Sequence, residues 1–233
     1  MFSILLGLIG DAPAVVLDAG SGEGSLARRL APLVNRVDAV DLSAAMIEVG
    51  RSLPGGDHPA LRWIVGSVET ADLDPPYALI TAGESAHWFD WDVALPRFHD
   101  LLTPSGMLVV VERHQAPRAW SDEIKRTLIP RYSTQRDFDA GFDMAAEWKR
   151  RGLVEPIGKA ETPAIPFRQG VDDYIESLFS ASSFSRDRMP PGEAEAFAAA
   201  VRELVTPHAA PDGMLDLEIS AGVGWARPLS PGC

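Results

Sequence analysis

The stretch LDAGSGEG, residues 17 to 24, carries the residues best placed to bind a ligand. Three evenly spaced glycines, Gly20, Gly22 and Gly24, follow a short apolar run. A glycine turn between a strand and a helix leaves backbone N–H groups available to hold part of a nucleotide. The third glycine of the dinucleotide fingerprint would fall where this chain has a serine, so the spacing departs from the pattern that binds NAD.

Two acids accompany this turn. Asp18 stands two residues before the first glycine, where a carboxylate would repel a bound pyrophosphate but attract a ligand with an ammonium and a sulfonium group. S-adenosylmethionine is such a ligand. Asp41 ends the next strand candidate, where a carboxylate can accept hydrogen bonds from both ribose hydroxyls. The two acids together favour S-adenosylmethionine over a dinucleotide.

Alternating strands and helices are expected to position these residues over the first half of the chain. The predicted strands are 14–19, 36–42, 62–67, 77–83 and 107–113. The predicted helices are 24–34, a helix capped by Ser43, and 91–102 with Pro96 bending or interrupting it. Such alternation predicts parallel strands joined by right-handed crossovers.

The second half of the sequence is richer in helical patterns. Helices are predicted over 117–130, 136–151, 171–181 and 191–206, and strands over 161–168 and 216–227. No linker is evident. We expect a single domain over 1–233, with a cofactor-binding half (1–113) and a substrate-side half (114–233) that carries helical insertions.

Taken in order, four motifs resemble those of the class I S-adenosylmethionine-dependent methyltransferases. They are VVLDAGSGEG, VDAVDLSAAM, WIVGSVE and LLTPSGMLVVVE, and the resemblance covers residues 4 to 113 best. It implies an α/β, Rossmann-like doubly wound fold. The mostly parallel sheet would have seven strands, helices on both faces and helical additions in the C-terminal half. It also implies S-adenosylmethionine as cofactor.

The resemblance assigns roles to individual residues. Asp18, Gly20 and Gly22 would line the methionine end, Asp41 would bind ribose, and adenine would lie near Met46, Ser67 and Val68. The predicted cofactor-binding set is Asp18, Gly20, Ser21, Gly22, Asp41, Leu42, Met46, Ser67, Val68 and Gly83. The alternatives are that Asp18 caps the next helix, that Asp41 is a strand-end acid, and that Met46 belongs to the core.

The segment GESAHWFDWD, 83 to 92, follows the fourth predicted strand. It resembles the HWF segment of the methyltransferase type 11 or trans-aconitate methyltransferase-like branch, which modifies small molecules. His87 and Trp88 are the predicted catalytic residues, His87 to accept a proton or orient a carboxylate and Trp88 to favour a nearby cation. The alternative is that both cover the start of the next helix.

The tetrapeptide DPPY, 74 to 77, matches a motif of amine methyltransferases that act on nucleic acids or proteins. That motif works at the carboxyl end of the fourth strand, where ligands bind in open α/β sheets. Here the apolar run follows the tetrapeptide, so we expect a loop that leads into a strand.

Substrate recognition is expected from the variable parts of the second half. The possible pocket residues are Arg168, Tyr174, Phe179, Phe184 and Arg186, although solvated charges and helix core are the alternative. Related enzymes carry a further helical segment before the first strand that closes over the cofactor. Only 14 residues precede Val15, so either late helices supply this lid or the recorded start lies downstream of the true one.

Composition excludes several classes of function. The formal charge of −12 and the lack of long basic runs argue against a nucleic-acid partner. The only cysteine is Cys233 and the five histidines are scattered, which argues against a zinc enzyme, so no metal is expected. The apolar start MFSILLGLIG is too short to span a bilayer.

We therefore expect a cytoplasmic methyltransferase that acts on a small molecule, at oxygen or nitrogen, with no membrane or nucleic-acid partner. A non-catalytic S-adenosylmethionine-binding regulatory protein and a nicotinamide-dependent oxidoreductase are the alternatives. Oligomeric state cannot be read from this sequence.

Overall fold

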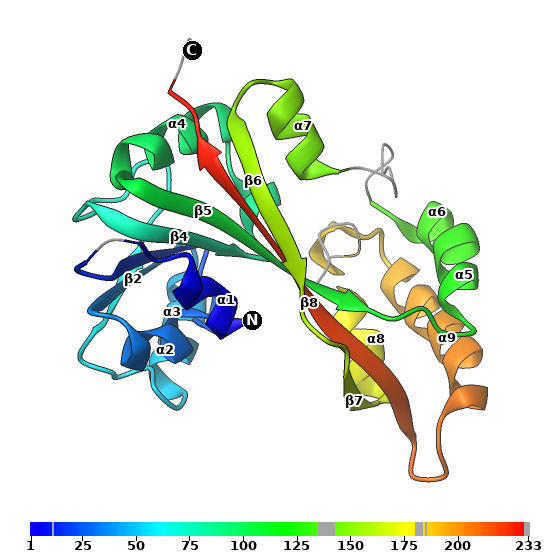
Figure 1. Cartoon of the computed structure of the whole chain (residues 1–233). Helices are drawn as coiled ribbons and strands as arrows, with labels where there is room; N and C mark the ends of the chain where they lie inside the picture. Colours follow the sequence, from blue (N-terminus) through cyan, green and yellow to red (C-terminus); the bar gives the residue numbers. More distant parts are fainter. Residues whose placement is uncertain (11, 135–142, 180–183, 185, 231–233) are drawn as a thin grey trace. The chain divides into compact units, whose positions relative to one another are not determined.

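A computed structural model describes residues 1–10, 12–134, 143–179, 184 and 186–230 (Figure 1). The chain divides into two compact units. The first unit comprises Met1–Arg113, Asp143–Thr162 and Ala221–Cys233. The second comprises His114–Phe142 and Pro163–Ser220.

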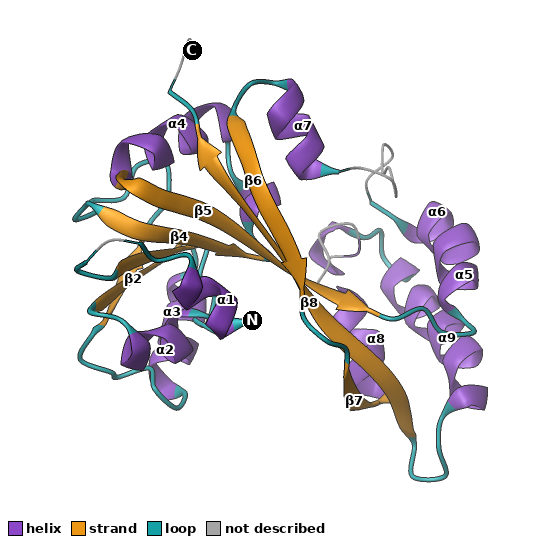
Figure 2. Cartoon of the chain, viewed as in Figure 1, coloured by secondary structure: helices purple, strands orange, loops and turns teal. Residues whose placement is uncertain are grey.

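The strands of the described residues join in one hydrogen-bonded sheet with the order β3-β2-β1-β4-β5-β8-β6, and β7 pairs with β8 off this path (Figure 2). Their bounds are β1 (Val15–Ala19), β2 (Arg36–Asp41), β3 (Leu61–Val65), β4 (Tyr77–Gly83), β5 (Leu102–Gln115), β6 (Val154–Glu161), β7 (Ile165–Gly170) and β8 (Met214–Pro228). Neighbours among β1 to β5 are parallel, whereas β6 and β7 run antiparallel to β8.

The predicted Rossmann-like, mostly parallel α/β fold is confirmed, and the described part of the first unit contributes to seven of the strands. From β1 the chain builds outward to β2 and β3, then returns to place β4 on the other side of β1. The direction of strand order therefore reverses between β1 and β4. In open α/β sheets ligands bind outside the carboxyl ends of the strands at such a point.

Helices cover both faces of the sheet in the first unit (Figure 1). On one face lie α1 (Phe2–Gly7), α2 (Ala27–Leu30) and α3 (Ala44–Ser52), and on the other α4 (Trp91–Leu101) and α7 (Met144–Arg150). Because side chains alternate along a strand, β1 supplies both cores. Val16 packs with Leu30 of α2, whereas Leu17 packs with Phe98 of α4. Both faces of β1 are buried, which explains its continuous apolar run.

The helix boundaries refine the predicted ones. The helix predicted over 24–34 begins only at Ala27, because Gly24 has a φ of +75° and belongs to the preceding turn. Ser43 caps α3 as predicted, since its Oγ accepts a hydrogen bond from the Met46 N–H at 3.2 Å. Pro96 lies inside α4, which continues through it.

One strand prediction was wrong. Residues 161–168 do not form a single strand, because β6 ends at Glu161 and β7 begins at Ile165. Strand β6 was not predicted because it contains Pro156 and Gly158, and proline and glycine usually mark the edge or end of a strand. Gly158 is required there, since a Cβ atom would lie 2.5 Å from the Trp225 ring.

The second unit has its own apolar core, centred on Phe197 of α9. Its helices are α5 (Ser121–Glu123), a π-helical segment (Ile124–Leu128), α6 (Ile129–Tyr132), α8 (Val171–Phe179) and α9 (Glu193–Val205). The helix predicted over 136–151 is described from Met144 onward, and residues 136–142 of it lie outside the described residues, as do residues 180 and 181 of the helix predicted over 171–181.

Candidate functional site: a pocket at the strand ends

A cavity of about 260 Å³ opens in the first unit at the carboxyl ends of β1 to β4. Its wall comes from the residue after β1, from the end of β2, and from the loops that follow β3 and β4. The lining residues are Gly20, Val40, Asp41, Leu42, Gly66, Val68, Glu69, Glu84, Ser85, Trp88 and Phe89. The volume lies just below the range for small-molecule sites, about 300–1,000 Å³. The pocket occupies the position that the reversal of strand order predicts.

The glycine turn brings backbone close to the loop after β4. Gly20 has a φ of +66°, and a Cβ atom on it would lie 2.6 Å from Ser85 Cβ. Ser85 Oγ also donates a hydrogen bond to the Ala19 carbonyl at 2.7 Å, which joins the ends of β1 and β4. Only glycine satisfies both the backbone conformation and the contact distance.

Asp41 holds the glycine turn from the end of β2. Its Oδ2 accepts a hydrogen bond from the Gly22 N–H at 2.7 Å, and its Oδ1 accepts one from the Ser43 N–H at 2.8 Å. The Ser21 N–H donates to the Val40 carbonyl at 2.9 Å, which fixes the same turn. A lining carboxylate is thereby pre-oriented on rigid backbone rather than left to rotate in solvent.

The predicted position of the Asp18 carboxylate at the mouth of the turn is wrong. Asp18 is 2% exposed, and it does not line the pocket. Its carboxylate accepts hydrogen bonds from Thr81 Oγ1 at 2.8 Å and from the Ala27 N–H, in the first turn of α2, at 3.1 Å. Side chains alternate along β1, so Asp18 faces the α2 side with Val16. The alternative reading, that Asp18 caps the next helix, is the arrangement observed.

Burial dominates the titration of Asp18. It raises the pKa of Asp18 from its ordinary 3.8 to about 6, although the hydrogen bonds from Thr81 and Ala27 oppose this rise and the charge of Asp41 adds to it. The carboxyl is therefore ionised at pH 7 but takes up a proton in mildly acidic solution.

Two further acids line the pocket from the loops after β3 and β4. The Glu69 carboxylate accepts hydrogen bonds from Ser67 Oγ and, at 2.9 Å, from the Asp90 N–H. Burial opposes ionisation of Glu69, but these hydrogen bonds outweigh it and hold the pKa of Glu69 below its usual value. Glu84 has a φ of +54°, an uncommon conformation for a residue other than glycine, and its carboxylate accepts a hydrogen bond from the Arg113 N–H.

The pocket gathers part of the predicted cofactor-binding set. Of the predicted residues, those that line it are Gly20, Asp41, Leu42, Val68 and Trp88. Those that do not are Asp18, Ser21, Gly22, Met46, Ser67, Gly83 and His87. Gly83 approaches α2 instead, since a Cβ atom on it would lie 2.8 Å from Leu26 Cδ1. Met46 stays beside the turn, with its Cε 3.6 Å from a Cβ built on Gly22.

Sequence reasoning missed six lining residues, Val40 within β2 and five in the loops after β3 and β4. The five loop residues are Gly66, Glu69, Glu84, Ser85 and Phe89. The signal that could have found them is position. Each lies within six residues after the end of β3 or β4, where a parallel sheet presents its ligand-binding edge. Their residue types alone gave no indication, because an acid or a serine in a loop is usually solvated.

His87 and Trp88 form a short 3-10 turn after β4, with ring centroids 5.2 Å apart. Trp88 is 55% exposed and lines the pocket, whereas His87 is exposed beside it. Partial burial lowers the pKa of His87 below its ordinary value, and the charges of Glu84 and Glu112 oppose that shift. The imidazole is therefore mostly neutral at pH 7 and able to accept a proton.

The DPPY segment lies at the other end of β4, as predicted. Tyr77 is the first residue of the strand and is fully buried. Its hydroxyl donates to Asp38 Oδ2 at 2.6 Å, and Asp38 also accepts two hydrogen bonds from Arg62, each at 3.0 Å. The tyrosine therefore ties β2 to β4 at the edge opposite the pocket.

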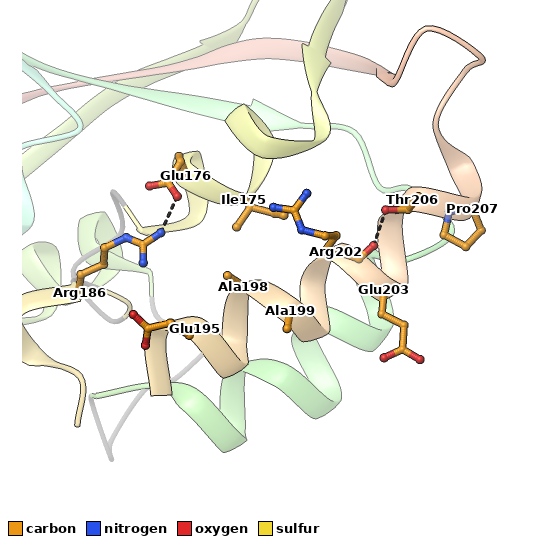
Figure 3. A pocket seen from close by; sticks show the side chains of 10 residues that line it. All are labelled: Ile175, Glu176, Arg186, Glu195, Ala198, Ala199, Arg202, Glu203, Thr206 and Pro207. Atoms are coloured by element: carbon orange, nitrogen blue, oxygen red, sulfur yellow. Dashed lines mark hydrogen bonds and ion pairs between the residues drawn. The ribbon is translucent and has the colours of Figure 1, made fainter. Parts of the chain in front are cut away.

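The second unit contains a separate groove of about 830 Å³ between α8 and α9 (Figure 3). Its apolar surface includes Ile175, Ala198 and Ala199. Arg186 lines the groove, forms an ion pair with Glu176 at 2.5 Å and lies over the Phe179 ring at 3.8 Å.

Most of the residues predicted to bind substrate are part of the apolar core or of ion pairs instead. Tyr174, Phe179 and Phe184 are buried in the second unit, and Phe184 stacks on Phe197 with centroids 4.7 Å apart. Arg168 of β7 is exposed and pairs with Asp212, just before β8, and with Asp216 in β8. The assignment of 114–233 to substrate recognition stays a prediction, as does the single domain over 1–233.

The described part of the chain contains neither a membrane-spanning helix nor a metal-binding cluster. No helix there is both long and apolar enough to cross a membrane. Within the same residues, no group of three or more His, Cys, Asp or Glu side chains is arranged to hold a metal ion.

The doubly wound sheet and the glycine turn at its switch point define a nucleotide-binding α/β domain. Residues 16–106 match the sequence model of a family described as methyltransferase domain. An uncharacterized methyltransferase of Mycobacterium tuberculosis is 36% identical over 98 residues, which are 41% of this chain and 49% of that protein. The chain thus spans about half the length of the mycobacterial relatives that it matches. A malonyl-[acyl-carrier protein] O-methyltransferase of Pseudescherichia vulneris is 26% identical over 173 residues, 70% of this chain and 65% of that protein.

A type II methyltransferase structure from Anaeromyxobacter dehalogenans has a similar fold, with a TM-score of 0.63 and 23% identity over 97% of this chain and 93% of that one. This likeness concerns the fold. The match over 16–106 shows a methyltransferase domain in that part of the chain, in agreement with the family that the sequence motifs resemble.

Proposed function

We propose that the chain binds S-adenosylmethionine in the strand-end pocket and transfers its methyl group to a small-molecule acceptor, at oxygen or nitrogen. The observation that carries this proposal is the charge of the pocket. Asp41, Glu69 and Glu84 all line it, and its described lining includes no lysine or arginine. Three carboxylates favour a ligand that carries a sulfonium and an ammonium over a diphosphate.

The residues present fit this cofactor. Each oxygen of Asp41 accepts one backbone hydrogen bond, and a carboxylate offers about four acceptor positions, so both ribose hydroxyls can still be bound. Gly20 and Gly66 have no side chains, so at these two positions the ligand can approach the protein backbone closely.

When bound, the cofactor would supply a sulfonium methyl group that an oxygen or nitrogen nucleophile can attack, with S-adenosylhomocysteine as the leaving group. The protein contributes mainly position and orientation, for which several kcal/mol is available. The neutral imidazole of His87 accepts the proton of a hydroxyl or amine acceptor, and the face of Trp88 favours a nearby cation by about 0.5–2 kcal/mol. A carboxylate acceptor needs no such base.

A relative supports oxygen as one acceptor atom. The Pseudescherichia vulneris protein is named as an O-methyltransferase of a malonyl group, and its similarity extends over 70% of this chain. The formal charge of −12 supports a small-molecule acceptor rather than nucleic acid. A cytoplasmic location stays a prediction.

Calorimetry tests the proposal. S-adenosylmethionine and S-adenosylhomocysteine should both bind, and Asp41→Asn should weaken both at least 10-fold, because hydrogen bonds to a charged group contribute about 1.5–3 kcal/mol each. Glu48→Gln is the matched control, since Glu48 is an exposed acid of α3 outside the pocket. Binding of NADH without either sulfur ligand would favour the oxidoreductase.

The transfer step needs its own assay. A radiolabelled methyl donor, incubated with panels of small carboxylates, alcohols and amines, should label at least one class and release S-adenosylhomocysteine in equal amount. Cofactor binding without labelling across all three panels would favour the non-catalytic regulatory protein instead.

A further inference from the structure

We propose that Arg97 is a positioning residue for the cofactor pocket, acting from α4 through the loop 66–71 without lining the pocket itself. This inference rests on the proposed function, since it concerns the affinity for S-adenosylmethionine. No sequence motif indicated Arg97.

The guanidinium of Arg97 is committed to the backbone of that loop. Nη1 donates to the Glu69 carbonyl at 2.6 Å, and Nη2 donates to the Ala71 carbonyl. Two donors in a planar fork fix both the distance and the direction of the carbonyls, which a lysine cannot do. The Nε atom is buried and has no hydrogen-bond partner within the described chain, so the hydrogen bonds shown for this side chain all go to the loop.

A second link joins the same loop to the N-terminus of α4. Asp90 is the N-cap residue of α4, and its N–H donates to Glu69 Oε1 at 2.9 Å. Inside the loop, Ser67 Oγ accepts a hydrogen bond from the Glu69 N–H at 3.1 Å, and the Ala71 N–H donates to the Ser67 carbonyl at 2.7 Å. The loop is therefore one hydrogen-bonded turn held at two points by α4.

These links join two walls of the pocket. Gly66, Val68 and Glu69 form one wall from the loop after β3. Ser85, Trp88 and Phe89, from the segment that leads into α4, form another. Val68 also packs into the same apolar core as Phe98 of α4. The separation of the two walls, and with it the fit to a bound ligand, is thus set by Arg97 and by the Glu69–Asp90 hydrogen bond.

The test compares Arg97→Lys with Arg151→Lys. A lysine at 97 keeps the charge but can replace only one of the two paired hydrogen bonds. Arg151 is the control, because it pairs with Asp92 on the outer side of α4. For Arg97→Lys we expect about a 10-fold weaker Kd for S-adenosylhomocysteine by calorimetry. The KM for S-adenosylmethionine should rise about as much, with kcat within twofold. Arg151→Lys should change none of these values.

A readout on the ligand-free protein accompanies the binding data. Amide hydrogen exchange at Ala71 and Asp90 should be faster in Arg97→Lys than in wild type or Arg151→Lys, because the loop is then held at one point less. Equal exchange and equal Kd in all three proteins would overturn the inference. A large loss of kcat in Arg97→Lys, or the same loss of affinity in Arg151→Lys, would also overturn it.

Failure of the two proposals is distinguishable. If wild type binds neither sulfur ligand, the proposed function fails. If wild type binds them and Arg97→Lys binds them equally well, only the positioning role fails.

Discussion

At the scale of single residues, Asp18 belongs to the glycine-turn motif for a structural reason and not because it attracts a cationic ligand. The carboxylate faces inward and joins β1, β4 and the first turn of α2 through Thr81 and Ala27. Its contribution to the site is indirect, because it fixes the helix that follows the glycine turn. The negative charge that suits a cationic ligand comes instead from Asp41, Glu69 and Glu84.

The raised pKa of Asp18 gives a testable pH dependence. Its pKa rises from 3.8 to about 6 on folding, so the folded state holds this proton more tightly. The stabilisation is fully present below pH 3.8 and is lost as the pH rises through about 6, a change of roughly 3 kcal/mol in the free energy of unfolding. Asp18→Asn cannot titrate, and its amide can still accept from Ala27 and donate to Thr81.

Urea unfolding of wild type and Asp18→Asn measures this effect. The free energy of unfolding of the variant, relative to wild type, should increase by roughly 2.5 kcal/mol between pH 4 and pH 7.5. Taking the difference removes groups that titrate in both proteins. A difference that stays constant over this range would mean that burial does not shift the titration of Asp18.

At the scale of elements, the two ends of the sheet have separate tasks. The carboxyl ends of β1 to β4 form the pocket, and the opposite edge carries the network of Asp38, Tyr77 and Arg62. The DPPY tetrapeptide lies at that opposite edge. Its tyrosine is therefore expected to stabilise the fold and to have no part in binding.

Tyr77→Phe tests this separation. Removal of the hydroxyl leaves Asp38 with its two hydrogen bonds from Arg62, so the cost should be about 1–2 kcal/mol in the free energy of unfolding. The Kd for S-adenosylhomocysteine should stay within twofold of wild type. A folded variant that had lost methyl transfer would restore the catalytic reading of the motif.

At the scale of the whole molecule, the chain contains two compact units with separate cores, while the sequence predicts one domain. Both β5 and β8 contribute residues to each unit. Calorimetric scanning with S-adenosylhomocysteine and with the Phe197→Ala variant can show whether the two units unfold together.

If the chain is a single cooperative domain, calorimetric scanning should show one transition. S-adenosylhomocysteine at 100 times its Kd should stabilise that transition by about 2.7 kcal/mol. Phe197→Ala, which removes a fully buried ring from the second unit, should destabilise the same transition by about 3–5 kcal/mol. Two transitions, one moved only by the ligand and the other only by the substitution, would instead indicate two domains.

The sequence by itself determined the fold class, the parallel strands and the ribose-binding candidate. Apolar runs, glycine turns and strand-end acids are local patterns, and a parallel sheet converts the ends of such runs into one edge. Ser43, Asp41 and Gly20 could be assigned in this way, because their roles depend on neighbours within a few residues or on the strand they follow.

Only the tertiary structure decided which way each side chain faces and which distant loops meet. Asp18 turned out to be buried because the alternation along β1 and the position of α2 together set its direction. Glu69 and Arg97 became neighbours because the loop after β3 packs against a helix that begins about 20 residues later. Contacts of this kind have no local signature, since they depend on the packing of elements that are separate in the chain.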